Sequence, residues 1–309
     1  MAISITSGYA GDVADVLISL MTTGNQAVEK GSVYVHAGVQ KSLAMPRFNA
    51  AADQIQANNP DPQTAQASGS FTYDERTLTP LSFMFYDETN PRDFEDVWRE
   101  FQPTGNLADR VDNPKILSAI TTETLKSFGT QIGKCIWQGD TAGATAVSWF
   151  DGFEKTLAAD GAINPAPVGA ITAGNVIAIL ESCVAAIPDA VYDDPNMIIH
   201  MPTSAFRLYQ QAARALDFKG SNIGDAMEDR FGGFAIRHYS GMTVNKIIIA
   251  KSTGGRDSNL WCGIDVNTDE TTVKIARKSA MSELFGVLVR AKYGTQVGNP
   301  TECVLYLSA

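Results

Sequence analysis

The sequence has no long apolar run, since none reaches the roughly 18 residues typical of a membrane-spanning helix. Its first residues, MAISITSGYAGDVADVL, contain no basic segment ahead of an apolar one, so no signal peptide is predicted. The four cysteines are far apart and form no CxxC pair, which predicts buried free thiols instead of a disulfide framework or a zinc site: Cys135, Cys183, Cys262 and Cys303. These absences favour a chain without membrane contact that stays in the cytoplasm where it is made.

Positive charge is also scarce. The 309 residues include 24 Lys and Arg against 34 Asp and Glu, for a net charge of −10. Tight binding of nucleic acid requires clustered Lys and Arg side chains that neutralise phosphates, so we do not expect it to be the main function of this chain. The acidic charge does not exclude a location close to DNA, because an acidic surface that faces DNA would repel it and not bind it. Hydrophobic residues make up 44% and charged residues 19%, as in an ordinary globular protein with one large domain or two smaller ones.

Catalytic and ligand-binding motifs are missing as well. There is no G-x-S-x-G and no P-loop, and paired glycines occur only between predicted strands, where they indicate turns. His36, His200 and His238 each lie inside a strand pattern without an acidic neighbour at a telling spacing. His200 is the best candidate of the three, because it lies near a strand end and a helix start, but a structural histidine bonded to backbone is favoured. We predict no catalytic residue, no cofactor and no metal site.

The first third of the chain contains a strand-rich stretch interrupted by an aperiodic segment. Residues 32–38 and 43–49 are predicted strands, and residues 70–86 are predicted to form one or two more. Between them, residues 51–69 carry two prolines and no apolar period, which indicates an exposed loop tip. We interpret 32–86 as a long hairpin, too thin to have a core of its own, that needs a partner surface.

Three helices are predicted before residue 140. Short ones are expected at 9–22 and at 90–101, and the strongest pattern covers 113–137. There Asn113 can cap the helix and Pro114 occupies its first position. Its apolar side chains recur on one face: Leu117, Ile120, Leu125, Phe128, Ile132 and Ile136. At 1.5 Å per residue the helix would be roughly 36 Å long, which is unusual for a domain of this size.

The stretch WQGDTAGATAVSWFDGFEK, residues 137–155, follows that helix. Gly139 and Asp140 suit a turn that ends a helix, and large apolar anchors flank it: Trp137, Trp149, Phe150 and Phe153. The acids Asp140 and Asp151 show no charged partner in the sequence pattern. The stretch is therefore weak as a ligand site, and we predict a hinge that joins the long helix to the next domain.

A compact α/β unit is predicted over residues 165–255. It comprises helices at 172–188 and 203–218 and strands at 196–202, 234–240 and 243–251. A strand-rich tail follows, with strands expected at 259–265, 271–278, 284–298 and 302–308.

The order of these parts resembles that of the major capsid proteins of tailed bacteriophages, the Hong Kong 97-type fold, over nearly the whole chain. The family has no invariant motif, so the resemblance is one of architecture. It implies an α+β fold with an N-terminal arm (1–31), an extended E-loop hairpin (32–88), a peripheral domain (89–164 and 256–309) and an α/β axial domain (165–255). The helix at 113–137 would be the spine helix of the peripheral domain, with core residues Leu117, Ile120, Phe128 and Ile132.

The resemblance further implies a structural protein, not an enzyme, that assembles as pentamers and hexamers into an icosahedral shell around a double-stranded DNA genome. Its location would be the virion, after assembly in the cytoplasm of a host bacterium. Implied partners are other copies of the chain, a portal protein and, as a further candidate, a decoration protein. The arm pattern begins close to Met1, which implies a separate scaffolding protein instead of a fused one, and the packaged DNA would make weak, non-specific contact.

Two alternatives stay open at this stage. An encapsulin-type shell has the same fold and houses an enzyme, although the long arm region and long hairpin favour a virus. A small α/β enzyme built on residues 196–255 is the alternative from another class, and it is disfavoured because no catalytic constellation is present.

Overall fold

The computed structural model describes residues 7–9, 26–50, 58, 71–90, 114–163, 165, 169–215, 229–265, 272–279, 282 and 284–308. Three expected features therefore lie essentially outside the described residues, namely the helix at 9–22, the loop tip at 51–69 and the helix at 90–101. The same holds for most of the predicted arm at 1–31.

The described helices and strands follow one another along the chain in a mixed order. The first part contains β1 (Ser7–Tyr9), α2 (Gln26–Glu29), β2 (Tyr34–Ala37), β3 (Leu43–Ala50), β4 (Phe71–Leu78), β5 (Leu81–Thr89) and α4 (Pro114–Gln138). The middle contains α5 (Phe153–Ala159), α6 (Val176–Ala185), α7 (Asp189–Tyr192), β6 (Met197–Pro202), α8 (Thr203–Ala215), β7 (Arg230–Phe231), β8 (Phe234–Tyr239) and β9 (Lys246–Lys251). The last part contains β10 (Leu260–Asp265), β11 (Thr272–Arg277), β12 (Phe285–Val297), the 3-10 turn η5 (Pro300–Glu302) and β13 (Val304–Leu307).

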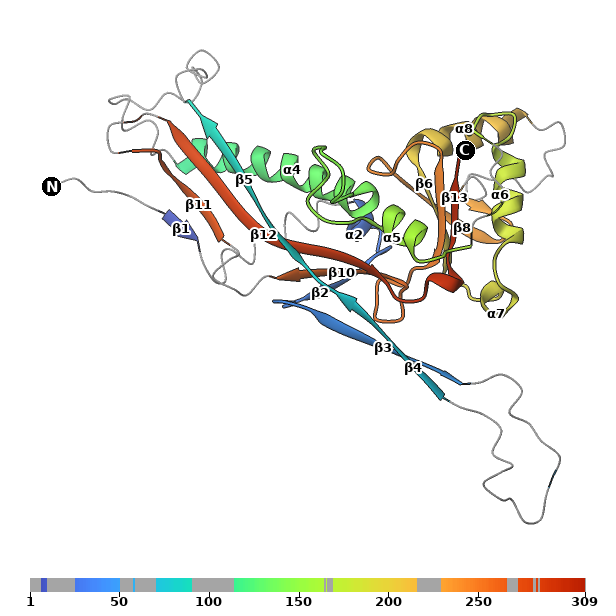
Figure 1. Ribbon diagram of the computed structural model, residues 1–309. Coiled ribbons are helices and arrows are strands. Elements are labelled where there is room, and N and C mark those ends of the chain that lie inside the picture. The colour runs from blue at the N-terminus through green and yellow to red at the C-terminus, as the bar shows by residue number, and fades with distance from the viewer. Residues whose placement is uncertain are drawn as a thin grey trace.

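The longest strand, β12, organises a six-stranded sheet (Figure 1). β5 pairs antiparallel with β12 over residues 285–293, while β11 and β10 pair antiparallel with its first and second halves. β1 extends the sheet beyond β11, and β2 runs parallel to β10 at the other end. The sheet therefore joins N-terminal segments to strands from the last quarter of the chain.

β3 and β4 form a separate ribbon that leaves the body of the molecule (Figure 1). They pair antiparallel from Leu43↔Leu78 to Ala50↔Phe71. The predicted hairpin over 32–86 was thus too long, because β2 and β5 belong to the six-stranded sheet. Val35 on β2 and Phe83 on β5 pack against the main core, which draws these strands out of the ribbon.

The long helix α4 has 25 residues and begins at Pro114, one residue from the predicted start. Its described second half carries the predicted apolar stripe, since Phe128, Ile132 and Ile136 are all buried. Lys126 and Thr130 on the other face are exposed. Leu117 and Ile120 belong to the helix, but their side chains lie outside the described part.

The α/β unit after residue 165 contains a five-stranded sheet with the order β13-β9-β6-β8-β7. Figure 1 shows α5 on one side of this sheet and α6 on the other. β13 comes from the C-terminal tail, so the prediction that residues 256–309 all complete the other domain was wrong for this strand. It pairs antiparallel with β9, from Val304↔Ile249 to Leu307↔Lys246, and its first three residues are buried.

The five-stranded sheet separates two hydrophobic cores. Side chains alternate along a strand, so Ile247 and Ile249 of β9 pack with α6 and α8, whereas Ile248 and Ala250 pack with α4 and the six-stranded sheet. This alternation also explains β13, whose Leu305 faces one core and Tyr306 the other. One core therefore lies between the two larger sheets, and the other lies between the five-stranded sheet and the helices α6 and α8.

Candidate functional site: the junction after the long helix

The end of α4 and the start of α5 touch through two glycines. The Gly152 amide donates a hydrogen bond of 2.8 Å to the Gly139 carbonyl oxygen, and the Gly139 amide donates to Cys135 at the helix end. A Cβ on Gly139 would lie 2.2 Å from the Phe150 carbonyl oxygen, and one on Gly152 would lie 2.5 Å from that of Trp137. The two segments cross at backbone contact distance, which only glycine permits here.

Aromatic rings fix this crossing from both sides. Trp137 and Phe153, both predicted as anchors, are buried and meet edge to face with ring centroids 5.7 Å apart. Phe150, another of the expected anchors, is also buried, and its ring lies 6.3 Å from that of Tyr293 on β12. Trp149, which was expected to be an anchor, is 49% exposed, with its indole N–H donating to the Ala146 carbonyl.

The loop between the two helices is held by one lysine. Lys155 forms ion pairs of 2.7 Å with both Asp140 and Asp151, so the expectation that these acids lack a partner was wrong. The hydrogen bond from Lys155 and one from the Ala142 amide lower the pKa of the Asp140 carboxyl. Burial pushes the pKa of Asp151 upward, but bonds from Lys155 and Thr141 outweigh it and lower that pKa.

A buried carboxylate ties α5 to the five-stranded sheet. Glu154 is 2% exposed, accepts a 2.9 Å hydrogen bond from the Thr243 amide and lies 3.0 Å from the Lys246 ammonium group on β9. A buried carboxylate needs such partners to offset its lost hydration. The contact therefore orients α5 relative to β9.

His200 lies at the centre of the junction, fully buried. Its Nε2 is 2.9 Å from the Ser252 hydroxyl and its Nδ1 is 3.2 Å from the Tyr239 hydroxyl, so side-chain hydroxyls take the place of the predicted backbone partners. Burial, together with the positive charge of Arg237, lowers the pKa of His200 to about 3. The ring is neutral, shielded from solvent and without an acid to orient it, which supports a structural role.

The other candidates for chemistry are structural in the same way. His238 stacks on Phe206 with ring centroids 4.5 Å apart, and burial lowers its pKa. The Tyr34 hydroxyl is 3.3 Å from Nδ1 of His36. All four cysteines are buried free thiols, as predicted, and burial raises the pKa to about 11 at Cys135 and to about 12 at the others.

Within the residues described, no group of three His, Cys, Asp or Glu side chains is placed to hold a metal ion. None of the helices in that part of the chain is both long enough and apolar enough to span a membrane.

Two exposed apolar surfaces, which the sequence analysis did not locate residue by residue, lie away from the junction. On the ribbon, Phe48 and Tyr73 pair across the strands with ring centroids 5.3 Å apart, and they are 70% and 59% exposed. On the body, a groove of about 320 Å³ runs between β5, α4 and the loop before α5, with exposed Met84 and Trp149 among its lining residues. The alternation of aromatic and polar residues at the start of β4 was the signal in the sequence for the apolar surface of the ribbon.

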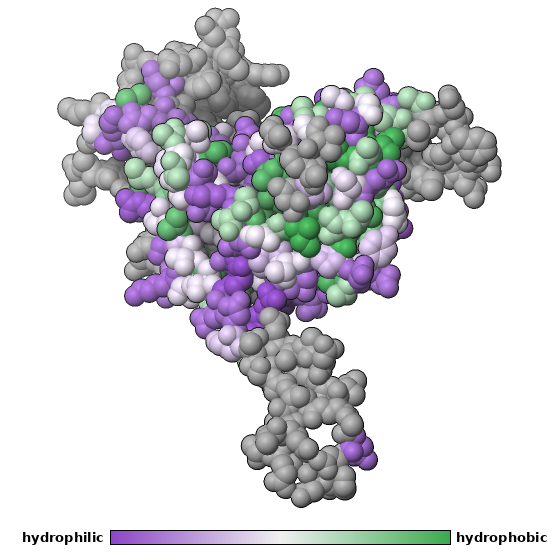
Figure 2. All heavy atoms as spheres, turned by 45° about the vertical axis from the view of Figure 1, so that its right-hand side comes forward, coloured by the Kyte–Doolittle hydropathy of each residue, from purple (hydrophilic) through white to green (hydrophobic). Residues whose placement is uncertain are grey.

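The face of the five-stranded unit is also partly apolar. Figure 2, turned so that this side comes forward, shows hydrophobic residues gathered over it. Val244, in the turn before β9, is 61% exposed, and Tyr192 of α7 is 44% exposed. Apolar surface of this kind often marks contact with other protein chains.

Comparison with known proteins identifies the fold through solved structures, not through sequence. No family model matches the sequence, and no curated protein matches it. This chain is similar to a chain in the structure of the satellite phage P4 procapsid including size determination (Sid) protein. The TM-score is 0.62 at 10% identity, and the match covers 98% of this chain and 93% of that one. A chain of the capsid of Myoviridae phage XM1 is similar with a TM-score of 0.59, at 10% identity, over 92% of both chains.

A third similar chain, from the capsid of an empty GTA particle computed with C5 symmetry, has a TM-score of 0.57 and 12% identity and covers 92% of this chain and 91% of that one. In each of the three cases the similarity covers 92% or more of this chain. The chain therefore has the α+β fold of phage capsid proteins, the fold class that the sequence resemblance implied.

Proposed function

We propose that this chain is the structural subunit of a phage-type capsid and assembles with itself into a closed icosahedral shell. The observation that carries the proposal is the similarity of its fold to chains of a procapsid and of capsids over more than nine-tenths of each chain. The site geometry is consistent with it, because the most elaborate cluster of buried side chains, around His200 and Trp137, packs the end of the long helix against the five-stranded sheet.

The ribbon supports assembly on physical grounds. A two-stranded sheet has no interior, so the exposed rings of Phe48 and Tyr73 can be buried only against another surface. The ribbon points away from its own body (Figure 1), which makes a second copy of the chain the natural partner. In a ring of copies, each subunit is then held at several edges and must break all of them to leave.

The domain assignment is part of the proposal. Residues 1–31 would form the arm, 32–88 the E-loop region with β3–β4 as its projecting ribbon, and α4 the spine of a peripheral domain at 89–164 and 256–309. Residues 165–255 would form the axial domain, and residues 304–307 would belong to it instead of to the peripheral domain, because β13 pairs with β9.

Pentamers and hexamers would form around axial domains, and the shell would enclose double-stranded DNA. The net charge of −10 supports weak, non-specific contact with the genome, because an acidic wall does not retain it. Proposed partners are a separate scaffolding protein, a portal protein and a decoration protein, and the proposed place of assembly is the cytoplasm of a bacterial host, with the virion as the final location.

Particle formation and cargo test this proposal against its rivals. The purified protein should sediment as rings or closed shells, and shells formed in the presence of phage DNA packaging components should contain nucleic acid. An encapsulin-type shell would instead contain a protein cargo. A small α/β enzyme would remain a small oligomer on a sizing column and give turnover in a substrate screen, which would refute the capsid function.

A further inference from the structure

A short N-terminal segment, residues 26–32, bridges the two sheets. It leads directly into β2 of the six-stranded sheet, and it also binds the five-stranded sheet along β8. The Gln26 side-chain oxygen accepts hydrogen bonds from the Ser240 amide (3.1 Å) and hydroxyl (3.3 Å). The Lys30 ammonium group donates to the His238 carbonyl oxygen at 2.5 Å and lies 5.1 Å from the centre of the Tyr239 ring.

The segment takes its shape from a helix-ending turn. The Ser32 amide donates to the Ala27 carbonyl and the Gly31 amide to the Val28 carbonyl, with Gly31 in the left-handed region at φ 62°. This turn places the Ser32 hydroxyl against the Tyr239 hydroxyl, where it also receives a 2.8 Å bond from Arg237. Ser32 is fully buried, so the segment is joined to the hydroxyl network of His200 at the centre of the junction.

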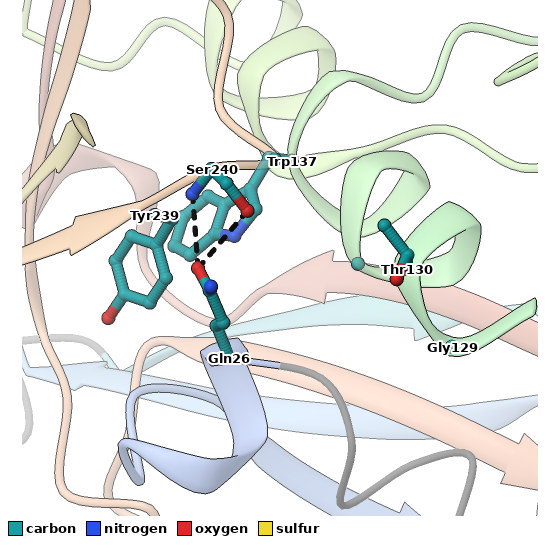
Figure 3. A pocket seen from close by; sticks show the side chains of 8 residues that line it. Gln26, Gly129, Thr130, Trp137, Tyr239 and Ser240 are labelled. Carbon is teal, nitrogen blue, oxygen red and sulfur yellow. Dashed lines mark hydrogen bonds between the residues drawn. The ribbon is translucent and has the colours of Figure 1, made fainter. Parts of the chain in front are cut away.

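Beside this segment, α4 meets the turn after β8 through backbone atoms and not through interdigitating side chains. A Cβ on Gly241 would lie 2.7 Å from the Gly133 carbonyl oxygen of α4. A cavity of about 70 Å³ adjoins this contact, lined by Gln26, Gly129 and Ser240 among others. Figure 3 shows Gln26 reaching from α2 to Ser240 beside the Trp137 and Tyr239 rings, with Gly129 and Thr130 of α4 across the cavity.

Such a contact permits small shifts. Because glycines carry no side chains that interdigitate, α4 and the turn after β8 can move slightly against each other, and the cavity provides space for this movement. The Trp137 and Tyr239 rings, with centroids 4.7 Å apart, remain packed as a pivot. On this side of the molecule, the polar bonds of Gln26, Lys30 and Ser32 then fix the angle between α4 and the five-stranded sheet. One further bond of 2.8 Å runs from the Gln138 side chain to the Gly241 carbonyl oxygen.

We propose that residues 26–32 act as a releasable clamp that sets the angle between the two sheets and, through it, the curvature of the shell. The second half of this inference rests on the proposed capsid function, whereas the first half concerns the isolated subunit. In a shell, a small change of angle in each subunit is repeated in every copy, so that loosening the clamp changes the size of the particle.

The test uses the double variant Gln26→Ala/Lys30→Met, which removes the bonds to Ser240 and His238 and keeps the apolar stem of residue 30 over Tyr239. Glu29→Gln is the matched control, because Glu29 lies on the same helical turn and is exposed. In unassembled protein, hydrogen exchange at the Ser240 amide should accelerate about fivefold or more in the double variant, the change expected for loss of one hydrogen bond. Exchange at the Gly152 amide should not change, nor should either amide in the control.

In particles, cryo-electron microscopy should show a shifted and broader distribution of diameters for the double variant and the parental distribution for Glu29→Gln. Unchanged exchange at Ser240 would overturn the clamp. Accelerated exchange with parental diameters would overturn its link to curvature, and so would a double variant that forms no particle of any size while Ser32→Ala forms parental ones. If the parent itself forms no particles, the capsid function fails, while the exchange experiment still decides the clamp.

Discussion

The Gly152 amide and the Gly139 carbonyl oxygen are 2.8 Å apart, and this bond closes the base of the loop of residues 140–151 between α4 and α5. Because neither glycine can accept a Cβ without meeting a backbone oxygen, the crossing angle of the two segments is set by backbone sterics. The angle at which α4 meets α5 therefore depends on Gly139 and Gly152 as well as on the aromatic residues of the junction.

Alanine at either glycine should destabilise the fold strongly. In Gly139→Ala and Gly152→Ala the new methyl group meets backbone oxygens that belong to fixed helix ends, so we expect a loss of about 3 kcal/mol or more in the free energy of unfolding. Gly143→Ala is the matched control in the same loop, since its nearest contacts are at 3.4 Å. Denaturant unfolding measures all three, and equal stabilities would contradict the described crossing.

The apolar face of α4 gives a second prediction. Phe128 is 3% exposed and its ring packs edge to face against Phe85, with centroids 5.7 Å apart. Phe128→Ala should leave a cavity that costs about 3–5 kcal/mol. Lys126→Ala on the exposed face should change stability by no more than about 0.5 kcal/mol.

Thermal melting and particle yield check the same pair of variants. Phe128→Ala should melt earlier and give insoluble or misassembled particles, whereas Lys126→Ala should assemble. A Phe128→Ala protein that melts and assembles like the parent would mean that the stripe does not face the core.

Acid should destabilise the fold through His200. The unfolded chain protonates a histidine below about pH 6.5, whereas the buried ring has its pKa lowered to about 3. Between these values the unfolded state binds the extra proton, so stability is complete above pH 6.5 and falls as the pH drops towards 3. At pH 4 the loss from this one group is roughly 3 kcal/mol.

His200→Gln isolates this effect, because glutamine keeps hydrogen-bonding groups for Ser252 and Tyr239 and does not titrate. Carboxyls with lowered pKa values, such as Asp140 and Asp194, add a loss of stability in acid that is common to both proteins. Urea unfolding from pH 7 to pH 4 should therefore give a shallower decline for the variant. Parallel declines would show that His200 is not held neutral in the folded state.

The sequence predicts those features that depend on neighbouring residues. The helical period and Pro114 place α4 within one residue at each end, since capping and burial act within a few turns. For β13, the pattern VLYL identifies a strand but not its sheet, because the partner is β9, more than fifty residues away in the chain. The extent of the ribbon was missed for the same reason: pairing of β2 with β10 is a long-range choice.

The junction shows the same division. Trp137 and Phe153 are buried, whereas of the adjacent Trp149 and Phe150 only Phe150 is buried, and only the tertiary structure decides which of two neighbouring aromatic rings points inward. Lys155 was overlooked although it lies four residues after Asp151, a spacing that brings side chains together at a helix start. The clamp of residues 26–32 joins groups more than two hundred residues apart, which no local pattern reports.

The ribbon aromatics should matter for assembly and not for folding. Phe48→Ser/Tyr73→Ser removes two exposed rings, so the monomer's stability should change by about 0.5 kcal/mol or less per site. Ring and shell formation should be lost or greatly weakened, because in the proposed shell these rings are buried between copies. Ala44→Ser, on the same face and closer to the body, is the control and should assemble, and a double variant that assembles equally well would remove the ribbon from the interface.

The central claim is that this chain builds a shell, and electron microscopy of the purified full-length protein tests it most directly. Negative-stain images at rising protein concentration should show rings and closed, roughly isometric particles, with the Phe48→Ser/Tyr73→Ser protein remaining as dispersed subunits. A parent protein that stays monomeric or forms only small oligomers at every concentration, also when co-expressed with a candidate scaffolding protein, would contradict the account.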